Sequence, residues 1–223
     1  PLEVERDLKH MKSMGFTSLF TRIDGNIFER SIPQLKDFMM RCDRYGFKLS
    51  LSCCNITDPM FYQPKAFRKF MNEAGLYRNP VLFSHDIAWE IGSQFYGDMY
   101  TPLWNKKWAD WLIERYGSVE NAEKDFEMEI PRAEDGSIKE EFINDGPWRI
   151  RSLAYRRFID DMVSRMWNNT VNDMREVDPV HLIGYRMGSI FYDSAALTST
   201  NKHIDYASPE GYSITVDEKG YYS

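Results

Sequence analysis

Apolar residues recur at helical spacing along several stretches of this chain. In segment 2–14, Val4, Leu8 and Met11 would share one face of a helix, and Gly15 suits its C-terminal end. Comparable periodicity recurs further along the chain. It predicts amphipathic helices at 2–14, 31–45, 65–77, 105–117, 118–126 and 149–177.

The predicted helix at 31–45 has a residue suited to each of its ends. Ser31 is predicted to cap its start, because a serine hydroxyl can accept a backbone N–H of the first turn. Gly46 would end it. Cys42 falls on the apolar face and is expected to be buried.

Short apolar runs between the helices predict strands. They are too apolar to leave one face in water, and their alternation with helices predicts a parallel sheet covered by helices. No glycine-rich turn follows the first run, so a dinucleotide-binding fold is unsupported. The strands are expected near 16–22, 47–53, 84–91, 181–187 and 204–208.

Five strands are fewer than the eight of a (β/α)8 barrel. The chain opens at a proline before a helix and stops at KGYYS without a closing element, so we expect a piece of a longer polypeptide. The predicted fold class is therefore α/β, an incomplete (β/α)8 barrel holding about strands 2–6. We assign residues 1–223 to this one partial catalytic barrel, with an elaborated strand-4 loop region at about 93–150.

Composition narrows the functional classes. The chain is 43% apolar and 28% charged with a net charge of −6, and no lysine and arginine cluster is dense enough for nucleic acid. No apolar run approaches the roughly 20 residues of a membrane span. Cys42, Cys53 and Cys54 make no disulfide framework. A secreted or periplasmic location is favoured over a cytoplasmic one, and the oligomeric state stays open.

Aromatic residues make up 15% of the chain, and most of them are expected to pack in a core. Aromatic faces also bind the C–H face of sugar rings. Four aromatic residues flank predicted loops, and at least one is expected to stack on a sugar: Tyr96, Tyr100, Trp104 and Trp148.

In a parallel barrel the active site forms where the strands end, so polar residues at those positions are the candidates. Arg22 ends an apolar strand, and its cation needs a carboxylate partner. That partner is either a catalytic group or a structural one, Asp24 or Glu90. The full set is Arg22, Asp24, Asn55, Glu90, Ser93, Gln94, Tyr96, Asp98, Arg186, Asp205, Glu210 and Tyr212.

The stretch IAWEIGSQ at 87–94 resembles the fourth-strand motif of the retaining glycoside hydrolases built on (β/α)8 barrels. In that clan the strand ends in a sequence close to W-E-I-G-N-E, whose last glutamate is the acid/base. Three other stretches resemble the clan's second, third and sixth strands in order, and one resembles a segment of its β-galactosidase-like members. They are MKSMGFTSLFTRID, YGFKLSL, HIDYASPEGYS and WADWLIERYGSVENAEKDF.

The resemblance implies a role for several residues. Gln94 would occupy the acid/base position, Arg22 the strand-two arginine and Tyr212 the strand-six tyrosine that contacts the nucleophile. Ser93 replaces the sugar-binding asparagine, and Glu210 stands where a histidine is common. The nucleophile itself would lie beyond Ser223. Substrate contacts are expected from Ser93, Asp24, Tyr96, Trp148, Arg186 and Glu210.

The resemblance therefore implies a retaining β-glycoside hydrolase acting on a β-linked oligosaccharide or polysaccharide. Glutamine has the shape of a protonated glutamate but cannot give up a proton, so Gln94 predicts an inactivated acid/base variant. The alternative is a naturally inactive carbohydrate-binding barrel. Either function needs no cofactor.

A metal site is not predicted. His85 and Asp86 are adjacent in a strand, so their side chains should point to opposite faces. The other histidines, His10, His181 and His203, lack the spacing of metal-binding motifs.

Overall fold

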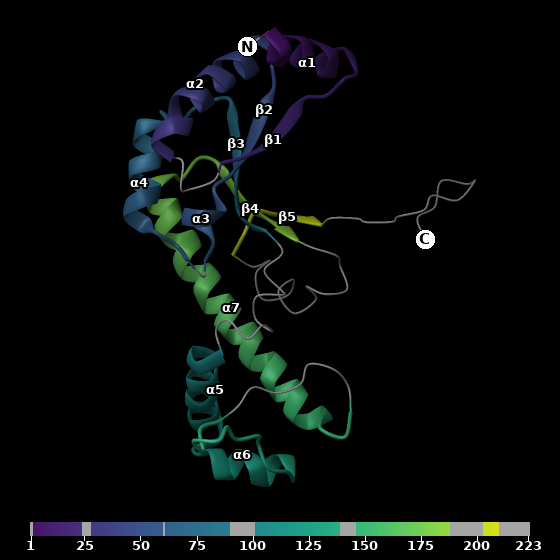
Figure 1. Ribbon diagram of the computed structural model, residues 1–223, viewed down its shortest axis with the longest axis vertical. Coiled ribbons are helices and arrows are strands. Elements are labelled where there is room, and N and C mark those ends of the chain that lie inside the picture. The colour runs from purple at the N-terminus through teal and green to yellow at the C-terminus, as the bar shows by residue number, and fades with distance from the viewer. Residues whose placement is uncertain are drawn as a thin grey trace, which may run out of the picture.

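The computed structural model describes residues 2–23, 28–59, 61–89, 101–138, 146–187 and 203–209. Five strands form one parallel sheet in the order β1-β2-β3-β4-β5 (Figure 1). All five overlap the predicted segments, so the α/β class and the five strands are confirmed. The strands are β1 (Ser18–Arg22), β2 (Lys48–Ser52), β3 (Leu82–Trp89), β4 (Leu182–Met187) and β5 (Tyr206–Pro209).

The order of the strands matters more than their number. Each strand pairs with the next one in the chain, so every crossover steps in the same direction across the sheet. Right-handed crossovers that never reverse put their helices on a single face. A doubly wound sheet reverses its strand order and is covered on both faces. The observed order is that of consecutive strands in a (β/α)8 barrel.

Most of the predicted helices are present, and the longest begins and ends at the predicted residues 149 and 177. The prediction that Ser31 caps a helix is wrong, because Ser31 lies inside α2. That helix continues through Pro33 because Leu35 and Met39 are buried on its inner face. The helices are α1 (Leu2–Ser13), α2 (Phe28–Tyr45), α3 (Cys54–Thr57), α4 (Pro64–Glu73), α5 (Thr101–Tyr116), α6 (Val119–Phe126) and α7 (Arg149–Val177).

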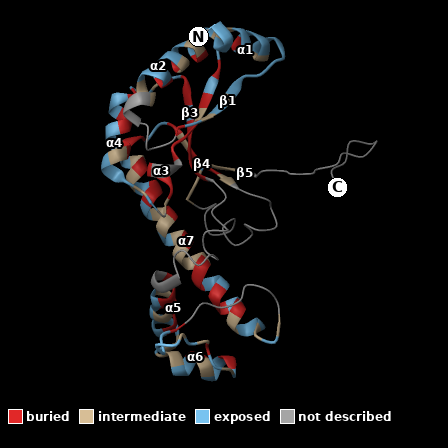
Figure 2. Cartoon of the chain, in the orientation of Figure 1, coloured by how far each residue is buried: buried red, intermediate tan, exposed pale blue. Residues whose placement is uncertain are grey.

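The main core lies between the sheet and the helices. Buried residues line the central strands and the inner sides of the helices (Figure 2). Trp167 of α7 packs edge-on against Tyr185 of β4, with 5.1 Å between ring centroids. Burial of each such large side chain stabilises the fold by roughly 1.5–3 kcal/mol. Members of this layer include Met39, Cys42, Leu49, Leu51, Phe67, Met71, Ile87, Trp167, Met174, Ile183 and Tyr185.

A helical lobe, formed by α5, α6 and the N-terminal half of α7, extends away from the sheet (Figure 1). With 29 residues, α7 is about 44 Å long, so one helix serves both the sheet and the lobe. Trp108 stacks on Trp111 at 5.4 Å and meets Tyr155 edge-on at 5.2 Å. The lobe thus has an aromatic core of its own. None of the described helices combines the length and apolar character needed to cross a membrane.

A buried cluster of His85, Asp178 and His181 fastens the end of α7 to β3. Oδ2 of Asp178 lies 2.7 Å from Nε2 of His85 and 2.7 Å from Nδ1 of His181. Nε2 of His181 lies 3.0 Å from the carbonyl oxygen of Asn79. Both ring nitrogens of His181 face acceptors, an arrangement that favours the doubly protonated, positively charged ring.

Burial and hydrogen bonding shift the pKa values of this cluster in different directions. Burial would raise the pKa of Asp178, but hydrogen bonds from His181 and His85 outweigh it and hold that pKa far below its usual range. Burial lowers the pKa of His85 more than Asp178 raises it. Burial also opposes the charge on His181, but the Asp178 contact prevails and raises its pKa. Within this cluster His181 thus favours its protonated form and His85 its neutral form.

Replacing Asp178 with asparagine should leave His181 without its counter-charge. We expect Asp178→Asn to lower the free energy of unfolding at pH 7 by about 3–5 kcal/mol, measured by urea denaturation. Asp110→Asn is the matched control, because Asp110 pairs with Lys106 on the exposed face of α5. Its expected effect is below about 0.5 kcal/mol. Equal effects of the two substitutions would contradict this role for the cluster.

The same variant should change the pH dependence of stability. The lowered pKa of His85 means that its contribution is complete above about pH 6.5 and is lost as the pH falls. The raised pKa of His181 means the opposite: its contribution is complete below about pH 6.5 and is lost as the pH rises. Without Asp178, both rings must be neutral when buried. The loss of stability between pH 6.5 and 5 should then steepen by about 1.4 kcal/mol per pH unit.

Candidate functional site

The face of the sheet opposite the helices is polar. Ser50, Ser84 and Tyr206 join β2, β3 and β5 through their hydroxyl groups. The Ser84 hydroxyl lies 2.9 Å from the oxygen of Ser50 and 2.8 Å from that of Tyr206, and Ser50 lies 3.3 Å from Tyr206. Burial raises the pKa of Tyr206, so its phenol is neutral at neutral pH.

Tyr206 reaches these serines by passing over Gly184 of β4, with which it pairs in register. A Cβ atom at position 184 would lie 2.1–2.4 Å from three atoms of the tyrosine ring. Such distances are not compatible with a side chain. Glycine at 184 therefore makes room for the ring.

These contacts require the sheet to curve. β2 and β5 are three strand spacings apart, which is about 14 Å in a flat sheet. The hydroxyls of Ser50 and Tyr206 nevertheless lie 3.3 Å apart. A second contact also spans three spacings: the guanidinium carbon of Arg186 on β4 lies 3.6 Å from the ring centroid of Phe20 on β1. The polar face is therefore concave.

Arg186 also contacts a buried carboxylate on this face. Its Nε lies 3.6 Å from Oδ2 of Asp86, whose side chain is 3% exposed. A buried carboxylate needs a cationic or hydrogen-bonding partner, and Arg186 supplies the charge. His85 points instead into the helix-side cluster, so the prediction that His85 and Asp86 face opposite sides is confirmed.

Arg22 lies at the C-terminal end of β1, two residues after Phe20 and on the same face of the strand. Its side chain is exposed. A cavity of about 300 Å³ adjoins it between β1 and α2. The residues that line this cavity are Thr21, Arg22, Ile23, Ser31, Gln34, Leu35 and Phe38. By their positions along β1 and β4, Arg22 and Arg186 are the predicted site residues that belong to the concave face, and Arg22 also borders the cavity beside α2.

The other predicted residues of the strand ends lie mainly outside the described residues. β3 ends at Trp89, five residues before Gln94, so the assignment of Gln94 to the acid/base position stays a prediction. The same applies to Asp24, Glu90, Ser93, Tyr96, Asp98, Tyr100, Glu210 and Tyr212.

Three further candidates are placed away from the strand ends. Trp148 directly precedes α7, at the end of that helix which is remote from β4. Trp104 lies within α5, is 5% exposed and meets Phe158 edge-on, so the prediction that it flanks a loop is wrong. The helix starts at Thr101, four residues earlier than expected, which puts Trp104 on its buried face. Asp205 accepts hydrogen bonds from Arg175 and the backbone of Ile183.

Sequence reasoning missed the polar layer inside the sheet. Ser50 and Ser52 alternate with leucines along β2, and Ser84 and Asp86 repeat the period of two along β3, on either side of His85. This period predicts a second, polar face. The runs were instead expected to be apolar on both faces. The His85–Asp178–His181 cluster was also missed. Only the three-residue spacing from Asp178 to His181 hinted at it.

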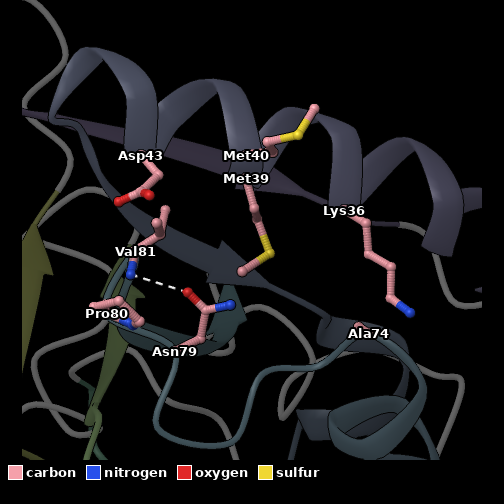
Figure 3. Close-up of a pocket in the computed structure, with 8 residues that line it drawn as sticks. All are labelled: Lys36, Met39, Met40, Asp43, Ala74, Asn79, Pro80 and Val81. Carbon is pink, nitrogen blue, oxygen red and sulfur yellow. Dashed lines mark hydrogen bonds between the residues drawn. The ribbon is translucent and has the colours of Figure 1, made fainter.

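Another cavity, of about 350 Å³, lies at the opposite end of the sheet, under α2 and beside the turn that leads into β3 (Figure 3). Asn79 shapes that turn by accepting a 3.0 Å hydrogen bond from the backbone N–H of Val81. In parallel barrels this end serves stability, so the cavity is not part of the candidate site. Its lining residues are Lys36, Met39, Met40, Asp43, Ala74, Asn79, Pro80 and Val81.

The fold is similar to that of solved β-galactosidases. The β-galactosidase from the psychrophilic Marinomonas ef1 matches 93% of this chain with a TM-score of 0.66 and 16% identity. That from Bacillus circulans sp. alkalophilus matches 98% with a TM-score of 0.63 and 16% identity. An agarase matches 94% with a TM-score of 0.59 and 13% identity. At these identities the likeness concerns the fold.

The chain spans only part of these proteins. It covers 38% of each of the two β-galactosidases and 32% of the agarase. No protein-family model matches the sequence, and no curated protein is similar to it. This segment therefore has an α/β fold of the kind found in barrel glycoside hydrolases.

The space above Gly184 offers a direct test of the concave face. We expect Gly184→Ala to lower the free energy of unfolding by about 1–3 kcal/mol, because the added methyl group meets the ring of Tyr206. The control is the same substitution in a Tyr206→Ala background, where the methyl group has room. A double-mutant cycle by urea denaturation gives the coupling. Purely additive effects would contradict the close approach of ring and glycine.

Proposed function

We propose that this chain is part of a (β/α)8 barrel of a retaining β-glycoside hydrolase acting on a β-linked galactose-containing saccharide. The observation that carries the proposal is the curved sheet of five parallel strands in chain order, with Arg22 at the C-terminal end of its concave face. The β-galactosidase and agarase likeness over more than nine-tenths of the chain supports it.

In this proposal the chemistry takes place at the C-terminal ends of the strands. Retaining hydrolysis uses two carboxyl groups about 5–5.5 Å apart, one as nucleophile and one as acid and then base. Arg22 would face the nucleophile and favour its ionised form. The carboxyl group of the acid would project from the loop after β3, where the sequence has Gln94.

An amide at position 94 has a definite chemical consequence. It can donate a hydrogen bond to the glycosidic oxygen but cannot transfer a proton to it, nor later accept one from water. The chain is then expected to bind saccharide and to hydrolyse it slowly. Glutamine at 94 also favours the second candidate, a barrel that binds carbohydrate without cleaving it.

The experiment is to restore the acid. In the complete protein, Gln94→Glu should raise the hydrolysis of aryl β-glycosides by roughly 10²–10⁴-fold over the parent. Gln63→Glu is the matched control, because it makes the same change at the exposed residue before α4 and should leave the rate unchanged.

Binding and turnover separate the two candidates. Saccharide binding by both proteins, with turnover only in Gln94→Glu, supports the hydrolase. If the parent protein and the Gln94→Glu variant both bind saccharide and neither hydrolyses it, the carbohydrate-binding barrel is favoured. Absence of both binding and turnover over a panel of β-linked sugars would contradict both functions.

A further inference from the structure

The described residues of the concave face carry more positive than negative charge near the C-terminal ends of the strands. β1 contributes Arg22, β3 contributes Asp86 and β4 contributes Arg186. Two guanidinium groups therefore share this face with one carboxylate. Each guanidinium group would favour the ionised form of a carboxyl group placed near it.

Two further titratable groups of the sheet, Tyr206 and Lys48, lie among the described residues, and neither adds a charge at this end. Tyr206 of β5 is neutral, because burial raises its pKa. Lys48 starts β2 at the opposite end of the sheet, and its ammonium group donates to the carbonyl oxygen of Pro80. In the part of the face that the structure describes, the positive charge thus comes from Arg22 and Arg186.

The position of Arg186 is fixed from two sides. Its guanidinium lies over the ring of Phe20, at 3.6 Å, and beside the carboxylate of Asp86. Phe20 precedes Arg22 by two residues on one strand face, which corresponds to about 7 Å along the strand. The charge of Arg186 is consequently held about one residue layer below Arg22, inside the concave face.

We propose that Asp86 and Arg186 are a positioning pair beneath the candidate active site. Asp86 holds the guanidinium over Phe20, and that guanidinium favours the ionised form of the carboxylate that acts at the strand ends. This inference rests on the proposed function, since retaining hydrolysis needs an ionised nucleophile. Neither residue has to touch the substrate.

The pair makes a prediction about the pH profile. The acidic limb of kcat/KM reports a group that must be deprotonated in the free enzyme. In the Gln94→Glu protein, Arg186→Met removes a cation and should move that limb upward by roughly 0.5–1 pH unit. Asp86→Asn removes only the negative charge, because the amide oxygen of asparagine can still accept from the guanidinium, which also keeps its contact with Phe20. This variant should therefore move the limb downward. A purely structural role would lower the rate without opposite shifts.

Two controls accompany these variants. Arg186→Lys keeps the positive charge and should leave the acidic limb in place, even if the looser geometry lowers kcat. It also keeps the test open should Arg186→Met fail to fold. Arg165→Met removes an arginine that pairs with Glu114 at 3.5 Å on the surface of the helical lobe. That change should leave the limb unmoved.

The outcomes distinguish the two proposals. Opposite shifts in Arg186→Met and Asp86→Asn support the positioning pair. If Gln94→Glu is active but the limb stays in place, or moves the same way in both variants, the pair has no such role and the hydrolase assignment stands. An inactive Gln94→Glu protein overturns the hydrolase assignment and the role of the pair with it.

Discussion

The curvature of the sheet is the constraint on which the other features depend. Two side-chain contacts on the same face join strands that are three positions apart in the sheet. Tyr206 of β5 contacts Ser50 of β2, and Arg186 of β4 contacts Phe20 of β1. Neither contact is possible across a flat parallel sheet. Because Gly184 has no side chain, the ring of Tyr206 can lie directly over its backbone. Curvature in this direction gathers the polar residues on the inside and leaves the helices outside.

The helix side of the sheet supports this arrangement. Asp178, held by His85 and His181, fixes the turn between α7 and β4 against β3. The start of β4 sets the register that places Gly184 beneath Tyr206 and Arg186 beside Asp86. A buried cluster on one face thus helps to position charged groups on the other. Arg22 stands at the rim of the same concave face, where the chemistry of parallel barrels takes place.

Much of this fold could be predicted from periodicity, because helices such as 149–177 and the five strands carry strong local patterns. Local patterns failed where tertiary packing decided the result. The buried face of α2 outweighed the cap expected at Ser31, and the early start of α5 buried Trp104. The contact of His85 with Asp178 joins residues 93 positions apart, and no local sequence pattern predicts such a pairing.

The most direct test of the account is a crystal structure of the complete protein with a β-linked galactose disaccharide. The sugar should occupy the concave side of the sheet at the C-terminal ends of β1 and β3, with Arg22 and the amide of Gln94 at its edge. A sugar bound only on the helical lobe or under α2, or a residue 94 turned away from the bound sugar, would contradict it.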